Sequence, residues 1–260
     1  MRRSSKPHVA VLLYHHIGVP RSEPAYHSLT VTPRQFQRQI QWLHWRGYTP
    51  ISCAQWITGQ KEAGSLPKKP IILTFDDAYS DLATHAFPVL ERYGFPSVVF
   101  AITGHAKGGS FWEGLPTMTM EQLRHWSTRG VEIGAHTRSH PDLTTISDLA
   151  ASEEVVGSRE DLNDAGLPPL SFAYPFGAFD ARSRRLVDGS FAMAFTCEEG
   201  LNDPATDPLL LKRTMVHPGD NLIDIEFRAA FGRSPLDWLR THGRLRSRIR
   251  KAFRRLKSAS

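Results

Sequence analysis

The 260-residue sequence has only two cysteines, Cys53 and Cys197, and their separation matches no metal or redox motif. A disulfide framework is therefore not expected. No apolar run approaches the roughly 20 residues that a membrane-spanning helix needs. The basic N-terminus precedes an apolar stretch, residues 9–14, which is too short for a signal peptide and lacks a cleavage site. We therefore expect a cytoplasmic protein, or one peripheral to the cytoplasmic membrane.

Two widespread catalytic motifs are also missing. The sequence contains no Gly-x-Ser-x-Gly elbow and no phosphate-binding loop, so serine-hydrolase and nucleotide-dependent activities have no support. Acidic residues are missing from residues 240–260, which hold nine Lys or Arg. The rest of the chain has 23 basic and 26 acidic residues, so the net charge of +6 belongs to this tail. The body of the chain therefore lacks the excess of basic residues that is typical of nucleic-acid-binding domains.

The tail has an apolar pattern within its basic sequence. Leu245, Ile249, Phe253 and Leu256 recur at spacings of four, four and three residues. This spacing predicts a basic amphipathic helix that binds a membrane surface or a polyanion, and the alternative is a disordered basic tail. We divide the chain into a domain over residues 8–238 and a tail over residues 239–260.

Strand and helix patterns alternate through the body of the chain. Capping boxes at Thr32 and Thr119 open two helices, and a helix is expected over 78–93 with an interruption at Pro88. The alternation predicts parallel β-α units. We expect a single-domain α/β fold, a distorted (β/α) barrel of about seven parallel strands, in preference to an open doubly wound sheet. The predicted strands cover residues 9–14, 70–75, 97–101, 131–135, 170–174, 191–196 and 209–216.

The sequence TFDD at residues 74–77 ends one of these strands. Adjacent residues on an extended strand point to opposite faces, so Asp76 and Asp77 can share a site only if the chain turns there. Loops at strand ends carry the chemistry of many α/β proteins. The alternative is that Asp77 is the N-cap of the next helix.

The sequence HTRSH at residues 136–140 follows another predicted strand. His136 and His140 can converge on a helix face or in a tight turn, and such a pair suits a divalent metal. Both this motif and the Asp pair would lie at the same edge of a parallel sheet. Two His and one Asp are a common zinc ligand set, which leaves the second Asp free to act as a general base.

The sequence AYPFG at residues 173–177 ends a third strand. Pro175 and Gly177 bracket a tight turn that can direct a backbone N–H inward, where it could stabilise an oxyanion. The alternative is an ordinary aromatic turn between a strand and a helix.

Together these motifs resemble those of the polysaccharide deacetylases of carbohydrate esterase family four, the NodB-homology family. TFDD resembles the first family motif, HTRSH the second, and AYPFG the third, which usually reads Arg-x-Pro-Tyr/Phe-Gly. The resemblance covers roughly residues 8–217. It implies a distorted (β/α) barrel and a hydrolase that removes N-acetyl, or less often O-acetyl, groups from an N-acetylated glycan or oligosaccharide.

The resemblance also implies roles for individual residues. Asp76 would be the base, and Asp77, His136 and His140 would hold the metal. The backbone N–H of Phe176 would help to bind the oxyanion. Zinc is the preferred metal, although this ligand set also admits cobalt, nickel, iron or manganese.

The chain departs from the family pattern in two places. Ala173 replaces the usual arginine of the third motif, and Arg213 could supply that charge from the last strand. No clean match exists for the fifth motif, which carries the general acid, so His217 is the candidate acid, with His15 and His16 as alternatives. The predicted substrate-binding residues are His15, Trp112, Tyr174, Pro175 and Arg213.

Two other functions remain open at this point. The same metal site could act on a non-sugar or N-formyl amide. A protein of another class, a catalytically weakened glycan-binding module, would explain the altered third and fifth motifs. The intact Asp76 argues against the module, because a protein that only binds glycans needs no base beside a metal ligand.

Overall fold

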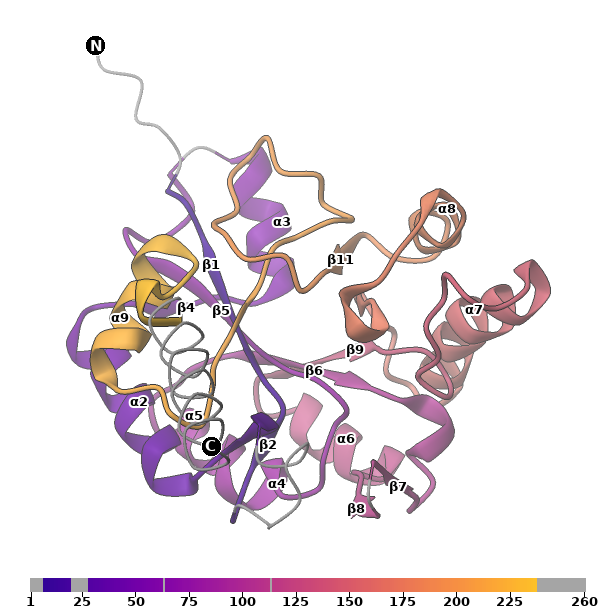
Figure 1. Ribbon diagram of the computed structural model, residues 1–260, viewed down its shortest axis with the longest axis horizontal. Coiled ribbons are helices and arrows are strands. Elements are labelled where there is room, and N and C mark those ends of the chain that lie inside the picture. The colour runs from indigo at the N-terminus through magenta and orange to yellow at the C-terminus, as the bar shows by residue number, and fades with distance from the viewer. Residues whose placement is uncertain (1–6, 20–27, 63, 113, 238–260) are drawn as a thin grey trace, which may run out of the picture.

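Parallel strands form one curved sheet at the centre of the protein (Figure 1). The computed structural model describes residues 7–19, 28–62, 64–112 and 114–237. The amphipathic helix predicted over 240–260 lies outside the described residues. In spatial order, the strands are β11 (Met193–Phe195), β10 (Ser171–Ala173), β9 (Val131–Ala135), β6 (Ser97–Ala101), β5 (Pro70–Phe75), β1 (Ala10–Tyr14) and β12 (Thr214–Met215).

The segment before and through β12 joins the two edges of this sheet. Leu211 forms a parallel bridge with Phe195 of β11, and three residues later Thr214 pairs with Leu12 of β1. One short stretch of chain therefore contacts both edge strands, and the sheet approaches a closed barrel. The predicted distorted (β/α) barrel is confirmed.

Several short strands pair outside the seven-strand order. β4 (Thr49–Pro50) extends the sheet beside the start of β5, and β2 (His16–Ile17) pairs in parallel with β3 (Thr30–Val31). β7 (Ser110–Phe111) and β8 (Leu115–Pro116) form an antiparallel hairpin between β6 and α6.

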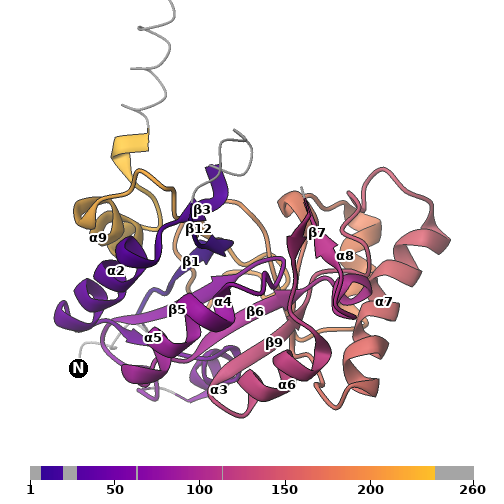
Figure 2. The ribbon, with the colours of Figure 1, turned by 90° about the horizontal axis from the view of Figure 1, so that it is seen from below.

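Helices cover the outside of the sheet, with α2 and α9 at one end of the molecule and α7 and α8 at the other (Figures 1 and 2). None of the helices within the described ranges is long and apolar enough to cross a membrane. The helices are α2 (Pro33–Trp45), α3 (Cys53–Lys61), α4 (Leu82–His85), α5 (Phe87–Arg92), α6 (Met120–Ser127), α7 (Asp148–Asp164), α8 (Ala181–Asp188) and α9 (Leu222–Phe231), with short 3₁₀ turns η1 (Thr103–His105) and η2 (Pro175–Gly177).

Strand residues alternate between two hydrophobic layers. On β5, Ile71 and Leu73 pack with the outer helices, whereas Ile72 belongs to the cluster inside the barrel. The alternation places every second residue inside, so the inward row of β5 continues from Ile72 through Thr74 to Asp76. The fold thus delivers Asp76 to the mouth of the barrel.

Two predicted elements differ from the structure. The helix expected over 78–93 begins only at Leu82, although its predicted interruption near Pro88 is confirmed by the break between α4 and α5. Asp77 and Ala78 have positive φ angles of 67° and 51°, so the chain makes a turn there, and the alternative of Asp77 as a helix N-cap is wrong. The strand expected over 209–216 is regular only at β12, because Leu211 and Thr214 pair with different strands.

Candidate active site

Four motif-bearing segments meet where parallel strands end. Residues 76–77 follow β5, His136 follows β9, the turn η2 follows β10, and His217 follows β12. Because the strands are parallel, their carboxyl ends lie at one edge, where α/β folds place binding sites. The sequence motifs therefore converge as the fold class predicts.

Asp77, His136 and His140 form a compact ligand set. Their ligand atoms lie within 4.8 Å of one another. Oδ1 of Asp77 is 3.6 Å from Nε2 of His136 and 3.7 Å from Nε2 of His140. This Oδ1 is buried and has no hydrogen-bond partner, which suits a cation rather than a structural contact. The donor set fits a divalent metal such as zinc.

The tautomer of His136 is fixed by its surroundings. Its Nδ1 lies 2.7 Å from the carbonyl oxygen of Ala173, so Nδ1–H donates and Nε2 keeps its lone pair toward Asp77. Burial lowers the pKa of His136 to about 3 and also lowers the pKa of His140. Both rings are therefore neutral, as metal ligands must be.

The turns that carry the ligands are conformationally strained. Positive φ angles occur at Asp77, Thr137, His140 and Phe176, none of which is glycine. Each such residue costs of order 1–3 kcal/mol and persists only where surrounding contacts hold it. The strain lies in the three turns that form the site, as expected where a backbone is shaped for function.

Asp76 is held by a different partner from Asp77. Both carboxylate oxygens of Asp76 accept hydrogen bonds from Arg213, at 2.6 Å from Nη1 and 2.9 Å from Nη2. Oδ2 of Asp76 lies 3.9 Å from Nε2 of His136, at the border of the ligand set. Burial raises the pKa of Asp76, but the charge and hydrogen bonds of Arg213, together with the electrostatic effects of His136 and His15, lower the pKa to about 2.

The neighbouring carboxyl group behaves in the opposite way. Burial and the charge of Asp76 raise the pKa of Asp77 to about 8. A cation bound beside Asp77 would reverse this effect, because it stabilises the ionised carboxylate. Two adjacent carboxylates thus have different partners and separate tasks.

Arg213 supplies the positive charge that the third motif lacks because of Ala173. Its side chain is 1% exposed, its Nε donates to the carbonyl oxygen of Thr196 at 2.8 Å, and the ring of Phe100 lies 5.6 Å from its guanidinium carbon. The barrel-closing segment brings this arginine against Asp76. At this position Arg213 can orient Asp76, but its burial leaves no surface for the substrate contact that we predicted.

The other predicted substrate residues divide into two groups. Tyr174 and Pro175 are buried, so they support the turn rather than face solvent. Trp112 is 40% exposed on the β7–β8 hairpin. Phe176, which we predicted only as a backbone donor to the oxyanion, is 58% exposed, and its ring lies 4.7 Å from that of His140. The exposed rings at the rim are therefore those of Phe176 and Trp112.

Histidines near the ligand set supply candidates for a proton donor. Burial lowers the pKa of His15 to about 4. The charge of Asp76 raises this pKa, whereas Arg213, His140 and His217 lower it. His217 lies at the end of β12, where its backbone N–H donates to Asp220 at 3.0 Å. His16 instead pairs with Asp81 through Nε2 and Oδ2 at 2.7 Å, beside a cleft of about 210 Å³.

The sequence analysis missed a clamp from α7 onto the HTRSH turn. Oε2 of Glu154 accepts the backbone N–H groups of Arg138 and Ser139, both at 2.8 Å. Arg138 in turn forms a bidentate pair with Asp161 at 2.9 Å. A Cβ at Gly157 would lie 2.3 Å from the guanidinium carbon of Arg138, so this glycine makes room for the pair. Glu154 gave no sequence signal, because it is one of several acids on a polar helix.

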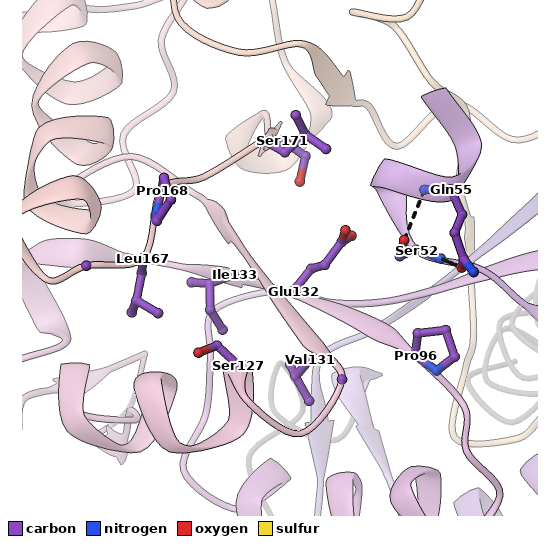
Figure 3. Close-up of a pocket in the computed structure, with 13 residues that line it drawn as sticks. Ser52, Gln55, Pro96, Ser127, Val131, Glu132, Ile133, Leu167, Pro168 and Ser171 are labelled. Atoms are coloured by element: carbon purple, nitrogen blue, oxygen red, sulfur yellow. Dashed lines mark hydrogen bonds between the residues drawn. The ribbon is translucent and has the colours of Figure 1, made fainter. Parts of the chain in front are cut away.

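A cavity of about 570 Å³ lies at the other end of the barrel (Figure 3). Glu132 of β9 faces it, and Ser52 and Gln55 lie across from Glu132 at the start of α3. Glu132 accepts the backbone N–H of Cys53 at 2.7 Å and of Ala54 at 3.2 Å, which caps α3. The carboxylate is thus used structurally, and the cavity is separate from the ligand set.

Comparisons with known proteins agree with the geometry. Residues 63–189 match the family profile described as polysaccharide deacetylase. A poly-β-1,6-N-acetyl-D-glucosamine N-deacetylase of Staphylococcus epidermidis is 27% identical over 200 residues, which are 73% of this chain and 68% of that protein.

Solved structures share the fold. The Streptococcus pyogenes deacetylase PplD, in complex with acetate, has a TM-score of 0.78 and 25% identity over 85% of this chain and 98% of that chain. IcaB from Ammonifex degensii has a TM-score of 0.72 and 24% identity, over 87% of this chain and 97% of that chain, and supports the fold alone. In its motifs, its fold and its match over residues 63–189, the chain is similar to the polysaccharide deacetylases, a family of hydrolases.

Proposed function

We propose that this protein is a metal-dependent deacetylase that hydrolyses N-acetyl groups on an amino-sugar glycan. One observation carries the proposal. Asp76 is ionised, is held by Arg213, and lies at the border of the Asp77, His136 and His140 ligand set without being part of it. A general base beside a metal site is the arrangement that amide hydrolysis requires.

Each residue has a distinct role in the proposed reaction. Asp77, His136 and His140 would hold the cation, which acts as a Lewis acid toward the amide carbonyl and lowers the pKa of water. Asp76 accepts the proton of the attacking water, and Arg213 keeps the carboxylate oriented. The backbone N–H of Phe176, on its left-handed turn, is proposed to donate to the developing oxyanion.

The leaving amine needs a proton, and we propose that an imidazole donates it. His217 is our proposed acid. His15 is the alternative, because it interacts electrostatically with Asp76 and His140 of the site. Replacement of each by Ala tests the assignment. The acid is the residue whose loss lowers kcat more for a poor leaving amine than for an activated aryl acetamide.

Zinc is the proposed native metal. Two imidazoles and one carboxylate form a common catalytic zinc set, although the same set accepts cobalt, nickel, iron and manganese. Metal analysis of the protein as purified, followed by reconstitution with each metal in turn, tests the proposal. A protein that holds another metal and gains no activity with zinc would contradict it.

The proposed substrate is an oligomer or polymer of N-acetylglucosamine. The relative from Staphylococcus epidermidis is named for poly-β-1,6-N-acetyl-D-glucosamine, which makes β-1,6-linked oligomers the first candidates. Exposed rings at Trp112 and Phe176 could stack on sugar faces beside the site.

A substrate panel tests the proposed function. Product release would be measured with β-1,6- and β-1,4-linked N-acetylglucosamine oligomers, N-formyl amides and a peptide-like acetamide. We expect acetate release from the glycans and little turnover of the formyl amides. Preferential turnover of formyl amides would favour the rival amidase, and tight glycan binding without turnover would favour a binding module.

A further inference from the structure

A surface away from the ligand set exposes large apolar side chains. It is formed by helices α2 and α9, which lie side by side at one end of the molecule (Figures 1 and 2). Trp45 is 70% exposed, and Ile223 and Phe231 are each 59% exposed. We call this surface the α2–α9 face. Exposed apolar clusters of this kind mark interaction sites on soluble domains.

The apolar residues lie on two helices that contact each other. Ile223, Phe227 and Phe231 recur every four residues and therefore share one side of α9, and the rings of Phe227 and Phe231 are 5.8 Å apart. Glu226, beside Phe227, accepts a hydrogen bond from Trp42 of α2 at 3.0 Å. The ring of Trp42 lies 5.2 Å from that of Trp45.

The face is positively charged. Helix α2 carries exposed Arg34 and Arg38 and contains no Asp or Glu. Both acidic residues of α9 are engaged, since Asp224 is buried against Ser234 at 2.8 Å and Glu226 pairs with Arg46 at 2.8 Å. Among the described residues of these two helices, the exposed charge that remains is therefore basic.

We propose that the α2–α9 face docks on an anionic lipid bilayer. Trp45, Ile223 and Phe231 would enter the interfacial region, where tryptophan and phenylalanine are favoured. Arg34 and Arg38 would meet acidic headgroups, at about 1 kcal/mol for each basic residue near the surface. The sequence that follows α9 adds nine Lys or Arg and no acid over residues 240–260, which extends the same charge complementarity.

Vesicle flotation of the full-length protein tests this proposal. The probes are vesicles of phosphatidylcholine alone and of phosphatidylcholine with phosphatidylglycerol. We expect the protein to float with the anionic vesicles and not with the neutral ones. The Ile223→Ser/Phe231→Ser double variant and Trp45→Ser should each lower the bound fraction roughly tenfold, because they remove apolar contacts but keep the charge. Arg34→Gln/Arg38→Gln should lower binding by a similar factor and reduce its dependence on salt.

Leu149 provides a matched control. It is 73% exposed on α7, at the opposite end of the molecule, so Leu149→Ser removes a comparable exposed apolar side chain without touching the face. We expect this variant to float like the wild type. All variants should hydrolyse a short soluble substrate at the wild-type rate. Loss of vesicle binding can therefore be distinguished from loss of enzymatic activity.

Three results would overturn the proposal. The first is wild-type protein that does not bind anionic vesicles. The second is undiminished binding by the Trp45 and Ile223/Phe231 variants, which would assign membrane attachment to residues 240–260 alone. The third is a wild-type dimer in sedimentation that Phe231→Ser converts to a monomer, which would make the face a subunit interface.

Discussion

At the scale of single residues, Asp76 and Asp77 show how environment separates two adjacent carboxylates. Arg213 keeps Asp76 ionised, whereas burial and Asp76 itself favour the protonated form of Asp77. The sequence indicated that the pair was unusual, but it left the N-cap alternative open. The sequence could not predict the turn with a positive φ angle at Asp77, because this turn depends on contacts from other strands.

Arg213→Met should shift the acid limb of the pH–rate profile upward. Without the guanidinium, the strongest effect that opposes burial of Asp76 is lost, so its pKa rises from about 2 and the base becomes protonated at higher pH. The measurement is kcat/KM against pH, with thermal melts to confirm folding. Arg213→Lys should retain part of the wild-type profile because it keeps the charge. An acid limb that stays in place in the Met variant would show that Arg213 does not tune the base.

Asp77→Asn should stabilise the metal-free protein, and more at pH 8 than at pH 5. The pKa of Asp77 is raised to about 8 on folding, so between the unfolded value near 4 and this value the folded state holds a proton that the unfolded state releases. Stability of the metal-free wild type therefore falls as pH rises through this window, and Asn removes the cause. The measurement is Tm in the presence of a chelator. A variant that melts below the wild type at pH 8 would contradict the assignment.

At the scale of elements, the sequence correctly predicted the start of a helix where residues of its own first turn form a capping box. Thr32 and Thr119 form the predicted capping boxes, and Pro33 opens α2 as expected. The prediction was wrong at residues 78–81, where the metal-site turn displaces the start of the helix. Helical propensity is a local property, and here a turn needed by the site overrides it.

Helix α7 should matter to metal binding although it contributes no ligand. Glu154 accepts the backbone N–H groups of Arg138 and Ser139, which lie between the two proposed histidine ligands. Glu154→Ala should lower metal affinity by roughly 10- to 100-fold, as loss of outer-sphere support commonly does.

The measurement is a competitive titration of the metal against a chelator. Glu153→Ala is the matched control, because Glu153 is exposed on the same helix and, among the described residues, forms no hydrogen bond or ion pair with the turn. Equal metal affinity of the two variants would show that the turn is held by other contacts.

At the scale of the whole molecule, closure of the barrel completes the site. The segment that bridges β11 and β1 is the one that carries Arg213, so tertiary closure supplies the charge missing at Ala173. Sequence analysis proposed Arg213 only as a candidate, since residues 76 and 213 are distant along the chain. The alternation of strands and helices predicted parallel β-α units, but it could not specify which residues meet across the mouth of the barrel.

Arg228→Met should destabilise the fold. The side chain of Arg228 is fully buried, and it donates to Asp220 at 2.7 Å and to Thr214 of β12 at 2.9 Å, so it joins α9 to the closing segment. Loss of one partner from a buried pair costs about 3–5 kcal/mol. Chemical denaturation should show a decrease of this order in the free energy of unfolding, and a change under about 1 kcal/mol would show that the network adds little.

The central claim is that Asp76 is the base and is not a metal ligand. The direct test is acetate release from an N-acetylglucosamine oligomer by metal-loaded wild type and Asp76→Asn, with bound metal measured on the same samples. We predict that the Asn variant binds metal in the same stoichiometry as the wild type and loses at least about 100-fold in kcat. Retained turnover, or loss of the metal together with the activity, would contradict this account.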